Sequence, residues 1–313
     1  MKTKPILIFT GEPNSIFFEI FFKALKYKRF KSPIILISSM KIIRSQVRKY
    51  KIKKKIKTLC LHDLKKVNLN NKSLNLIDIN YNKKKPKVYI KNCFDTAFQI
   101  LKSKRIYKFI NGPINKSKFL DKKFPGITEY ISQNFKVSSN AMLIFNKELS
   151  VCPITTHLPL KFVSKTINQK IIKEKAILIN NFFTKNIGIK PRIGVTGLNP
   201  HCESTHEFNE DNKIVLPAIK KLKKRGLKIS GPLSADTIFL KQNRVKYNVI
   251  IGMYHDQVLS PLKTLKEYDA INITLGLPFF RISPDHGPNK NMINKNLSSP
   301  LSLIRALEFL DKR

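Results

Sequence analysis

The sequence has few cysteines and no long hydrophobic run. Its four cysteines, Cys60, Cys93, Cys152 and Cys202, form no C-x-x-C pair. This pattern suits reduced thiols in a cytosol better than a disulfide framework. No apolar run approaches the roughly 18–20 residues of a membrane span. Only four apolar residues follow Met1–Pro5, too few for a signal-peptide core. We therefore expect a cytoplasmic protein without a membrane partner.

Several common nucleotide and hydrolase signatures are also missing. The sequence contains no G-x-G-x-x-G, so the Rossmann dinucleotide fingerprint is absent. It contains neither G-x-x-x-x-G-K-[ST] nor G-x-S-x-G, which weighs against a P-loop NTPase and an α/β-hydrolase.

Acidic residues are scarce: 20 Asp and Glu stand against 60 Lys and Arg, for a net charge of +40. Such a charge raises the alternative of a basic nucleic-acid-binding protein. Lysine greatly outnumbers arginine, however, whereas phosphate and base recognition favours arginine forks. The lysines are also spread along the chain. A generally lysine-coated surface that attracts anionic substrates is therefore the favoured interpretation, with no nucleic-acid partner.

The order of predicted elements indicates an α/β protein. A chain of 313 residues with 42% hydrophobic content can form one large or two coupled domains. Short apolar runs that predict strands alternate with amphipathic stretches that predict helices. The predicted strands are 6–9, 33–37, 74–79, 107–110, 141–145, 149–152, 192–195 and 247–252. The predicted helices are 16–27, 41–50, 93–102, 161–183, 212–224 and 300–310, and residues 51–87 are expected to form an exposed, lysine-rich excursion with one strand.

Three histidines occupy similar places in this pattern. His157, His201 and His255 each follow a short apolar run and are separated by 44 and 54 residues. Neutral imidazoles that converge from three strand ends could form a site for a divalent metal with positions open to substrate. Spacing this long leaves convergence open. A polar turn without a metal is the alternative for His255, and Lys263 and Arg281 are either anion-binding or merely solvated.

Seven motifs, in order along the chain, resemble one enzyme family. They are 111–116 (NGPINK), 155–160 (TTHLPL), 197–201 (GLNPH), 231–237 (GPLSADT), 253–257 (MYHDQ), 272–278 (NITLGLP) and 285–287 (DHG). The chain resembles the 4-hydroxythreonine-4-phosphate dehydrogenase family of pyridoxal phosphate biosynthesis over about residues 11–286.

The resemblance implies an isopropylmalate/isocitrate-dehydrogenase-like α/β fold, which binds nicotinamide without a Rossmann fingerprint. It implies two interleaved α/β/α domains, with an active-site cleft between them. We expect residues 1–130 plus 285–313 to form the first, and residues 131–284 to form the second, which carries the metal ligands and the dimer interface. Family members are homodimers with a shared active site.

The same resemblance implies the reaction. The expected activity is NAD-dependent (or NADP-dependent) oxidation of 4-phosphooxy-L-threonine to 2-amino-3-oxo-4-phosphooxybutanoate, followed by decarboxylation to 3-amino-2-oxopropyl phosphate. Each site is expected to use one divalent ion: zinc, magnesium or cobalt. An alternative within the class is oxidation of a phosphorylated four-carbon sugar acid, erythronate or threonate 4-phosphate.

The family's site residues map onto this chain by motif. The metal ligands map onto His157, His201 and His255, and the substrate-binding residues onto Thr128, Lys263, Asn272 and Arg281. Asp256 or Asp236 is the expected base, and Lys263 is expected to stabilise the enolate. The region of Asp285, His286 and Gly287 is expected to meet the cofactor.

Four features depart from the family pattern. Ile127 stands where the family has a substrate-contacting His, and Cys202 replaces a small residue after His201, where a thiol could touch the metal. Pro288 replaces a Thr, and the opening loop 11–19 reads GEPNSIFFE. The substitution of Ile127 keeps the sugar-acid alternative open.

Overall fold

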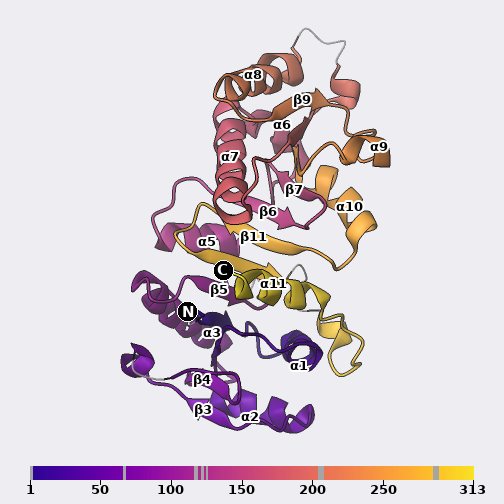
Figure 1. The fold of residues 1–313 in the computed structure, drawn as a ribbon. Helices are drawn as coiled ribbons and strands as arrows, with labels where there is room; N and C mark the ends of the chain where they lie inside the picture. Colours follow the sequence, from indigo (N-terminus) through magenta and orange to yellow (C-terminus); the bar gives the residue numbers. More distant parts are fainter. Residues whose placement is uncertain are drawn as a thin grey trace. The chain divides into compact units, whose positions relative to one another are not determined.

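The computed structural model describes residues 3–65, 68–115, 119–120, 123–124, 126–203, 208–284 and 289–313. The chain divides into two compact units, residues 1–134 with 278–313 and residues 135–277. Figure 1 shows the first unit drawing elements from both ends of the colour scale, because the yellow C-terminal segment belongs with the indigo and purple elements. The first unit is thus discontinuous in sequence.

The strands of the first unit are parallel to their neighbours throughout. Their spatial order is β3 (Ile56–Thr58), β4 (Leu74–Asp78), β2 (Ile34–Ser38), β1 (Ile6–Phe9), β5 (Lys108–Asn111) and β12 (Phe280–Pro284). β1, β2 and β5 are buried along their whole length. Continuous burial is expected for parallel strands covered on both faces, and it explains why β1 and β2 are almost entirely apolar.

Helices surround this first set of strands. They are α1 (Phe17–Tyr27), α2 (Met40–Lys49), α3 (Pro86–Lys102), α5 (Ile127–Asn134) and α11 (Leu301–Asp311), with short 3₁₀ turns at His62–Lys65 and Lys290–Met292. α3 packs on β1 and β2, whereas α11 packs on β12 and against α1. The first and last helices of the chain therefore share one core.

The second unit has a mixed set of strands. Their order is β11 (Ile271–Leu275), β6 (Ala141–Phe145), β7 (Ser150–Pro153), β10 (Val249–Gly252), β8 (Ile193–Thr196) and β9 (Ile229–Leu233). β6 is antiparallel to β11 and β7, which confirms the predicted hairpin, and the run from β7 to β9 is parallel. The carboxyl ends of four parallel strands therefore lie at the same edge of this set of strands.

The helices of the second unit include α6 (Val163–Thr166), α7 (Gln169–Phe182), α8 (Leu216–Lys224), α9 (Lys241–Arg244) and α10 (His255–Lys266). The π-helical turns Phe183–Ile187 and Asp211–Val215 extend α7 and precede α8, and 3₁₀ turns occur at Leu160–Phe162 and Pro200–Cys202. Val258, Leu259 and Leu262 of α10 join the core formed by β6, β7 and β10. This apolar stripe anchors the helix that begins at His255.

Three predictions of local structure are wrong. The helix expected at 161–183 is interrupted, because Ile167 is extended and Asn168 caps a new helix by accepting a hydrogen bond from the Ile171 amide, 3.0 Å. The excursion at 51–87 contains a second strand, β3, paired with β4. α3 begins at Pro86 instead of Cys93, since proline is well tolerated in the first turn of a helix.

No helix in the described part of the chain is long and apolar enough to cross a membrane. This finding agrees with the absence of long hydrophobic runs from the sequence.

Phe94 of α3 lies at the centre of an aromatic cluster in the first unit. Its ring centroid is 5.1 Å from Phe9, 5.3 Å from Tyr130, 5.5 Å from Phe98 and 5.6 Å from Phe119. Its side chain is fully buried.

We predict that Phe94→Ala lowers the free energy of unfolding by about 3–5 kcal/mol, because the substitution leaves a cavity among well-packed rings. Urea unfolding followed by far-ultraviolet circular dichroism measures this loss. Val88→Ala, on the same helix at a position 51% exposed, is the matched control. A loss below about 1 kcal/mol for Phe94→Ala would contradict the packing account.

Candidate active site

Three histidines follow three neighbouring parallel strands of the second unit. His157 follows β7, His255 follows β10 and His201 follows β8, and β10 pairs with both of the other strands. Because parallel strands end at the same edge of a sheet, the three imidazoles are carried to one edge with His255 on the middle strand. The strand order thus supports the idea that residues far apart in sequence can serve one site.

The His157 and His255 rings are 6.2 Å apart between centroids and are inclined by 37°. The two loops that carry them are joined by Thr155. Its amide and hydroxyl both donate to the carbonyl of Met253, at 3.2 and 2.8 Å. These two hydrogen bonds hold the chain after β7 against the chain after β10.

A carboxylate orients the His255 ring. Nδ1 of His255 lies 2.6 Å from Oδ1 of Asp256. Because an ionised carboxylate can only accept, Nδ1 is the donor of this bond, and in the neutral imidazole Nε2 then keeps its lone pair. A histidine held in this tautomer is ready to ligate a metal through Nε2.

The His201 ring also lies near a carboxylate, but the distance is greater than at His255. Its Nδ1 lies 3.5 Å from the hydroxyl of Ser234 and 3.9 Å from Oδ2 of Asp236. The Ser234 hydroxyl donates to Asp236 at 2.7 Å and holds the pKa of that carboxyl below its usual range. Both His201 and Cys202 have left-handed backbone angles, φ 55° and 64°. Such angles are uncommon outside glycine and give this loop a specific shape.

The donor set fits a divalent metal, although the ligands are not assembled around one point. Imidazole nitrogens suit zinc and cobalt, and the Nδ1 atoms of His201 and His255 face carboxylates as metal-bound histidines do. Within the described residues, no group of three or more His, Cys, Asp or Glu side chains lies close enough to hold a metal. The structure therefore brings His157 and His255 together and leaves His201 outside that pair.

The first unit contains a buried cation. Arg281 of β12 is 4% exposed; its Nε donates to Oδ1 of Asn111 at 2.7 Å and its Nη1 donates to Oγ1 of Thr128 at 3.3 Å. Burial lowers the pKa of Arg281 to about 10, while the nearby Glu129 carboxylate opposes the shift. The guanidinium is still charged at neutral pH, so it can attract a carboxylate or phosphate.

The other predicted substrate residues lie in the second unit. Asn272 is on β11, and its Oδ1 is buried without a hydrogen-bond partner among the described residues. Lys263 is on α10, two turns after His255. An unsatisfied buried amide oxygen suggests a ligand contact, because such atoms are costly to leave unpaired. The predicted cofactor residues Asp285, His286 and Gly287, like Pro288, lie outside the described residues.

Comparisons with known proteins agree with the motifs. Residues 29–310 match the family described as pyridoxal phosphate biosynthetic protein PdxA. The chain belongs to this family. A 4-hydroxythreonine-4-phosphate dehydrogenase of a Sulfurihydrogenibium species is 36% identical to it, over 97% of this chain and 96% of the relative.

Solved structures support the same fold for this member of the PdxA family. A 4-hydroxythreonine-4-phosphate dehydrogenase from Klebsiella pneumoniae is 26% identical, with a TM-score of 0.82 over 98% of this chain and 97% of that chain. An isocitrate dehydrogenase from Methylococcus capsulatus is 9% identical, with a TM-score of 0.52 over 98% and 85% of the two chains. The predicted isocitrate-dehydrogenase-like α/β fold is confirmed.

Two departures from the PdxA-family pattern have clear structural settings. Ile127, the first residue of α5, is 6% exposed, so it packs as a core residue, and Thr128 beside it still contacts Arg281. The Cys202 thiol lies over Gly197, where a Cβ atom would be 2.7 Å from Sγ. Burial and the Asp211 carboxylate raise the pKa of Cys202.

Gln257 is a positioning residue that was not predicted from the sequence. Its Oε1 accepts from the Met253 amide at 2.6 Å and from the Thr196 hydroxyl at 2.8 Å, and its Nε2 donates to the Gly197 carbonyl at 2.8 Å. One side chain thus joins the end of β10 to the end of β8. Its place in the MYHDQ motif was the available signal.

Asp211 was also missed. Its carboxylate is fully buried and accepts from the amides of Leu198 and Asn199, at 2.7 and 3.0 Å, and from the Asn199 side chain at 3.1 Å. It therefore fixes the loop that leads to His201. An acidic residue is rare in this basic chain, but its sequence position alone does not indicate these backbone partners.

We predict that Asp211→Asn lowers the free energy of unfolding by about 2–4 kcal/mol, because an amide cannot accept all three hydrogen bonds and places donors against donors. Urea unfolding measures the loss, and hydrogen exchange should show faster exchange of the Leu198 and Asn199 amides. Glu210→Gln is the matched control, since Glu210 accepts only the Asn199 side chain among the described residues. Equal effects of the two substitutions would contradict the role of Asp211.

Proposed function

We propose that this chain oxidises 4-phosphooxy-L-threonine at its C3 hydroxyl with NAD or NADP and that the resulting β-keto acid loses carbon dioxide to give 3-amino-2-oxopropyl phosphate. The observation that carries the proposal is the match to 4-hydroxythreonine-4-phosphate dehydrogenase over almost the full length of both chains. The sugar-acid alternative is not favoured by these comparisons.

We propose that His157, His201 and His255 hold one divalent ion: zinc, magnesium or cobalt. When bound, the ion supplies Lewis-acid chemistry that lowers the pKa of the substrate hydroxyl. The approach of the His157 and His255 rings supports two of the ligands. His201 is assigned by motif and by its place after β8.

Asp256 and Asp236 remain the candidates for the base that removes the hydroxyl proton while hydride leaves C3 for the nicotinamide. Each carboxylate lies beside Nδ1 of a proposed ligand histidine. Each can therefore fix a ring orientation, and each can take a proton directly or through a water it holds.

Arg281, Thr128, Asn272 and Lys263 are the proposed substrate-binding residues. The buried guanidinium of Arg281 and the Thr128 hydroxyl are suited to the phosphate or carboxylate end. In the second step the bond between C1 and C2 breaks and carbon dioxide leaves. The electron pair of the broken bond forms an enolate. The Lys263 ammonium would stabilise that charge until C2 takes a proton.

Several finer assignments belong to the same proposal. They are cofactor binding near Asp285, His286 and Gly287, a homodimer with a shared active site and a location in the cytoplasm. All four cysteines are free, which is consistent with a reducing compartment.

The direct test is NAD(P) reduction by the purified protein with 4-phosphooxy-L-threonine, erythronate 4-phosphate and threonate 4-phosphate, each with and without chelator. We expect the amino-acid phosphate to give the highest kcat/KM and the chelator to abolish turnover. A higher kcat/KM for either sugar-acid phosphate would contradict the substrate assignment.

We predict that His255→Ala lowers kcat/KM at least about 100-fold, because it removes the central proposed ligand. Metal content measured by mass spectrometry after dialysis should fall in parallel. His62→Ala, at an exposed position in the first unit, is the control and should keep both properties. Wild-type turnover in His255→Ala would refute the ligand assignment.

We predict that Arg281→Lys raises KM for the phosphorylated substrate about 10- to 100-fold, because an ammonium cannot reproduce the planar fork that contacts Asn111 and Thr128. Steady-state kinetics at saturating cofactor measures the change. Arg305→Lys, which alters a partly exposed arginine paired with Glu308, is the control. An unchanged KM in Arg281→Lys would remove this residue from the substrate site.

A further inference from the structure

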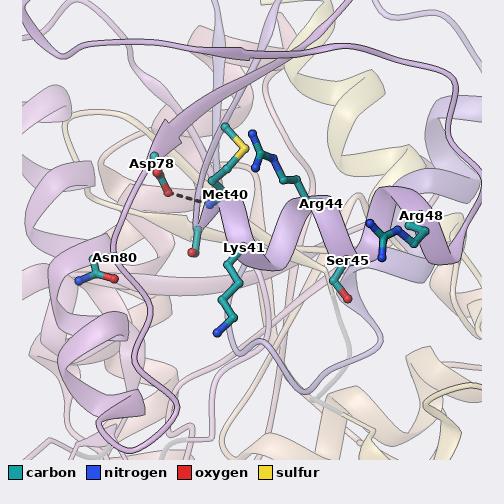
Figure 2. A pocket seen from close by; sticks show the side chains of 8 residues that line it. Met40, Lys41, Arg44, Ser45, Arg48, Asp78 and Asn80 are labelled. Carbon is teal, nitrogen blue, oxygen red and sulfur yellow. Dashed lines mark hydrogen bonds between the residues drawn. The ribbon is translucent and has the colours of Figure 1, made fainter.

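A cavity lies within the first unit, away from the residues discussed so far. Its volume is about 790 Å³, and its lining includes Lys41, Arg44, Ser45 and Arg48 of α2, together with Asp78 and Asn80 at and after the end of β4. Figure 2 shows the α2 side chains, together with Asp78 at the end of β4 and Asn80 after it, around this space. Because β2 and β4 are parallel, the cavity lies at their carboxyl ends, where α/β proteins bind ligands.

The positive charges of this cavity come from one helix face. Lys41, Arg44 and Arg48 are spaced i, i+3 and i+7, so they lie along one side of α2. The opposite side is held by Ile42 and Ile43, which are buried in the core. The three cations are therefore presented by a rigid element.

These cations lack protein partners within the described part of the chain. Neither guanidinium, nor the Lys41 ammonium, has a hydrogen bond or ion pair to any described residue. The nearest acidic group of the lining, Asp78, is already engaged, because its Oδ1 accepts from the Met40 amide at 2.7 Å (Figure 2). The positive end of the helix dipole adds to the field beside Lys41, in the first turn of α2.

Arginine is the informative residue type here. The chain has only ten arginines among its 60 basic residues, and two of them line this cavity. A general excess of lysine does not explain why two arginines line this cavity. Arginine forks match phosphate oxygens in geometry and charge, whereas lysine serves as a point charge.

We propose that this cavity binds the phosphomonoester group of a phosphorylated small molecule. Its volume lies in the range of small-molecule sites. Two sources share this chemistry: the 2′-phosphate of NADP, and a separate phosphorylated metabolite. The cofactor source rests on the proposed function, whereas the phosphate site does not.

The test uses isothermal titration of the full-length protein at low salt with three probes: 2′,5′-ADP, 5′-AMP and inorganic phosphate. The variant is Arg44→Gln with Arg48→Gln. The matched control is Lys220→Gln with Lys224→Gln on α8, which removes the same charge at the same spacing from an exposed helix face. KM values for NADP and NAD are measured on the same three proteins.

We expect the arginine variant to raise the dissociation constant for 2′,5′-ADP or phosphate at least about tenfold, and the lysine control to change it less than about twofold. A selective rise in KM for NADP, with KM for NAD unchanged, supports the cofactor as the source. Unchanged KM values for both cofactors, with phosphate binding lost, support a separate metabolite.

Three results would overturn the proposal: no binding of any probe by the wild type, equal binding by the arginine variant and the wild type, or an equal loss in the lysine control. Binding is measured without turnover. The wild type could therefore lack turnover and still bind phosphate through Arg44 and Arg48. That result would refute the dehydrogenase activity and would support the phosphate site.

Discussion

The parallel pairing of β7, β10 and β8 is the constraint on which the candidate site depends. Their backbone hydrogen bonds bring the ends of three distant segments to one edge of the second unit. Side chains then refine that placement. Thr155 joins the first two strand ends, Gln257 joins the second and third, and Asp211 shapes the loop before His201.

Much of the fold could be predicted from the sequence, because its strands are short, apolar and bounded by polar loops. β1 was predicted at its observed bounds, and the hairpin of β6 and β7 was recognised from two apolar runs around Asn146. The break near Asn168 was not predicted, because the apolar residues Val163, Ile167 and Ile171 continue at helical spacing across it, and only the extended Ile167 and Asn168 separate the two helices. β3 was missed because it is a three-residue edge strand with little burial.

The candidate site was predicted less completely, for a physical reason. The approach of His157 to His255 depends on strand order, which the sequence does not state, so the spacing of the histidines left their convergence open and the family motifs supplied the connection. Gln257 and Asp211 act mainly on backbone atoms that belong to other segments. Their partners become visible only when β8 and β10 are paired. Arg281 was predicted as an anion-binding residue, but its burial and its bond to Asn111 required β5 and β12 to be neighbours.

Because the first unit is discontinuous in sequence, it is completed only when the last part of the chain has been synthesised. The second unit is continuous, so all of its residues are synthesised before β12 and α11. Until then β5 lacks its outer neighbour, and α1 lacks the helix that covers it. An unpaired strand edge and exposed phenylalanines favour aggregation of a nascent chain. Truncation near the C-terminus would therefore damage the unit that begins the chain, while the histidine-bearing unit would retain every strand it needs.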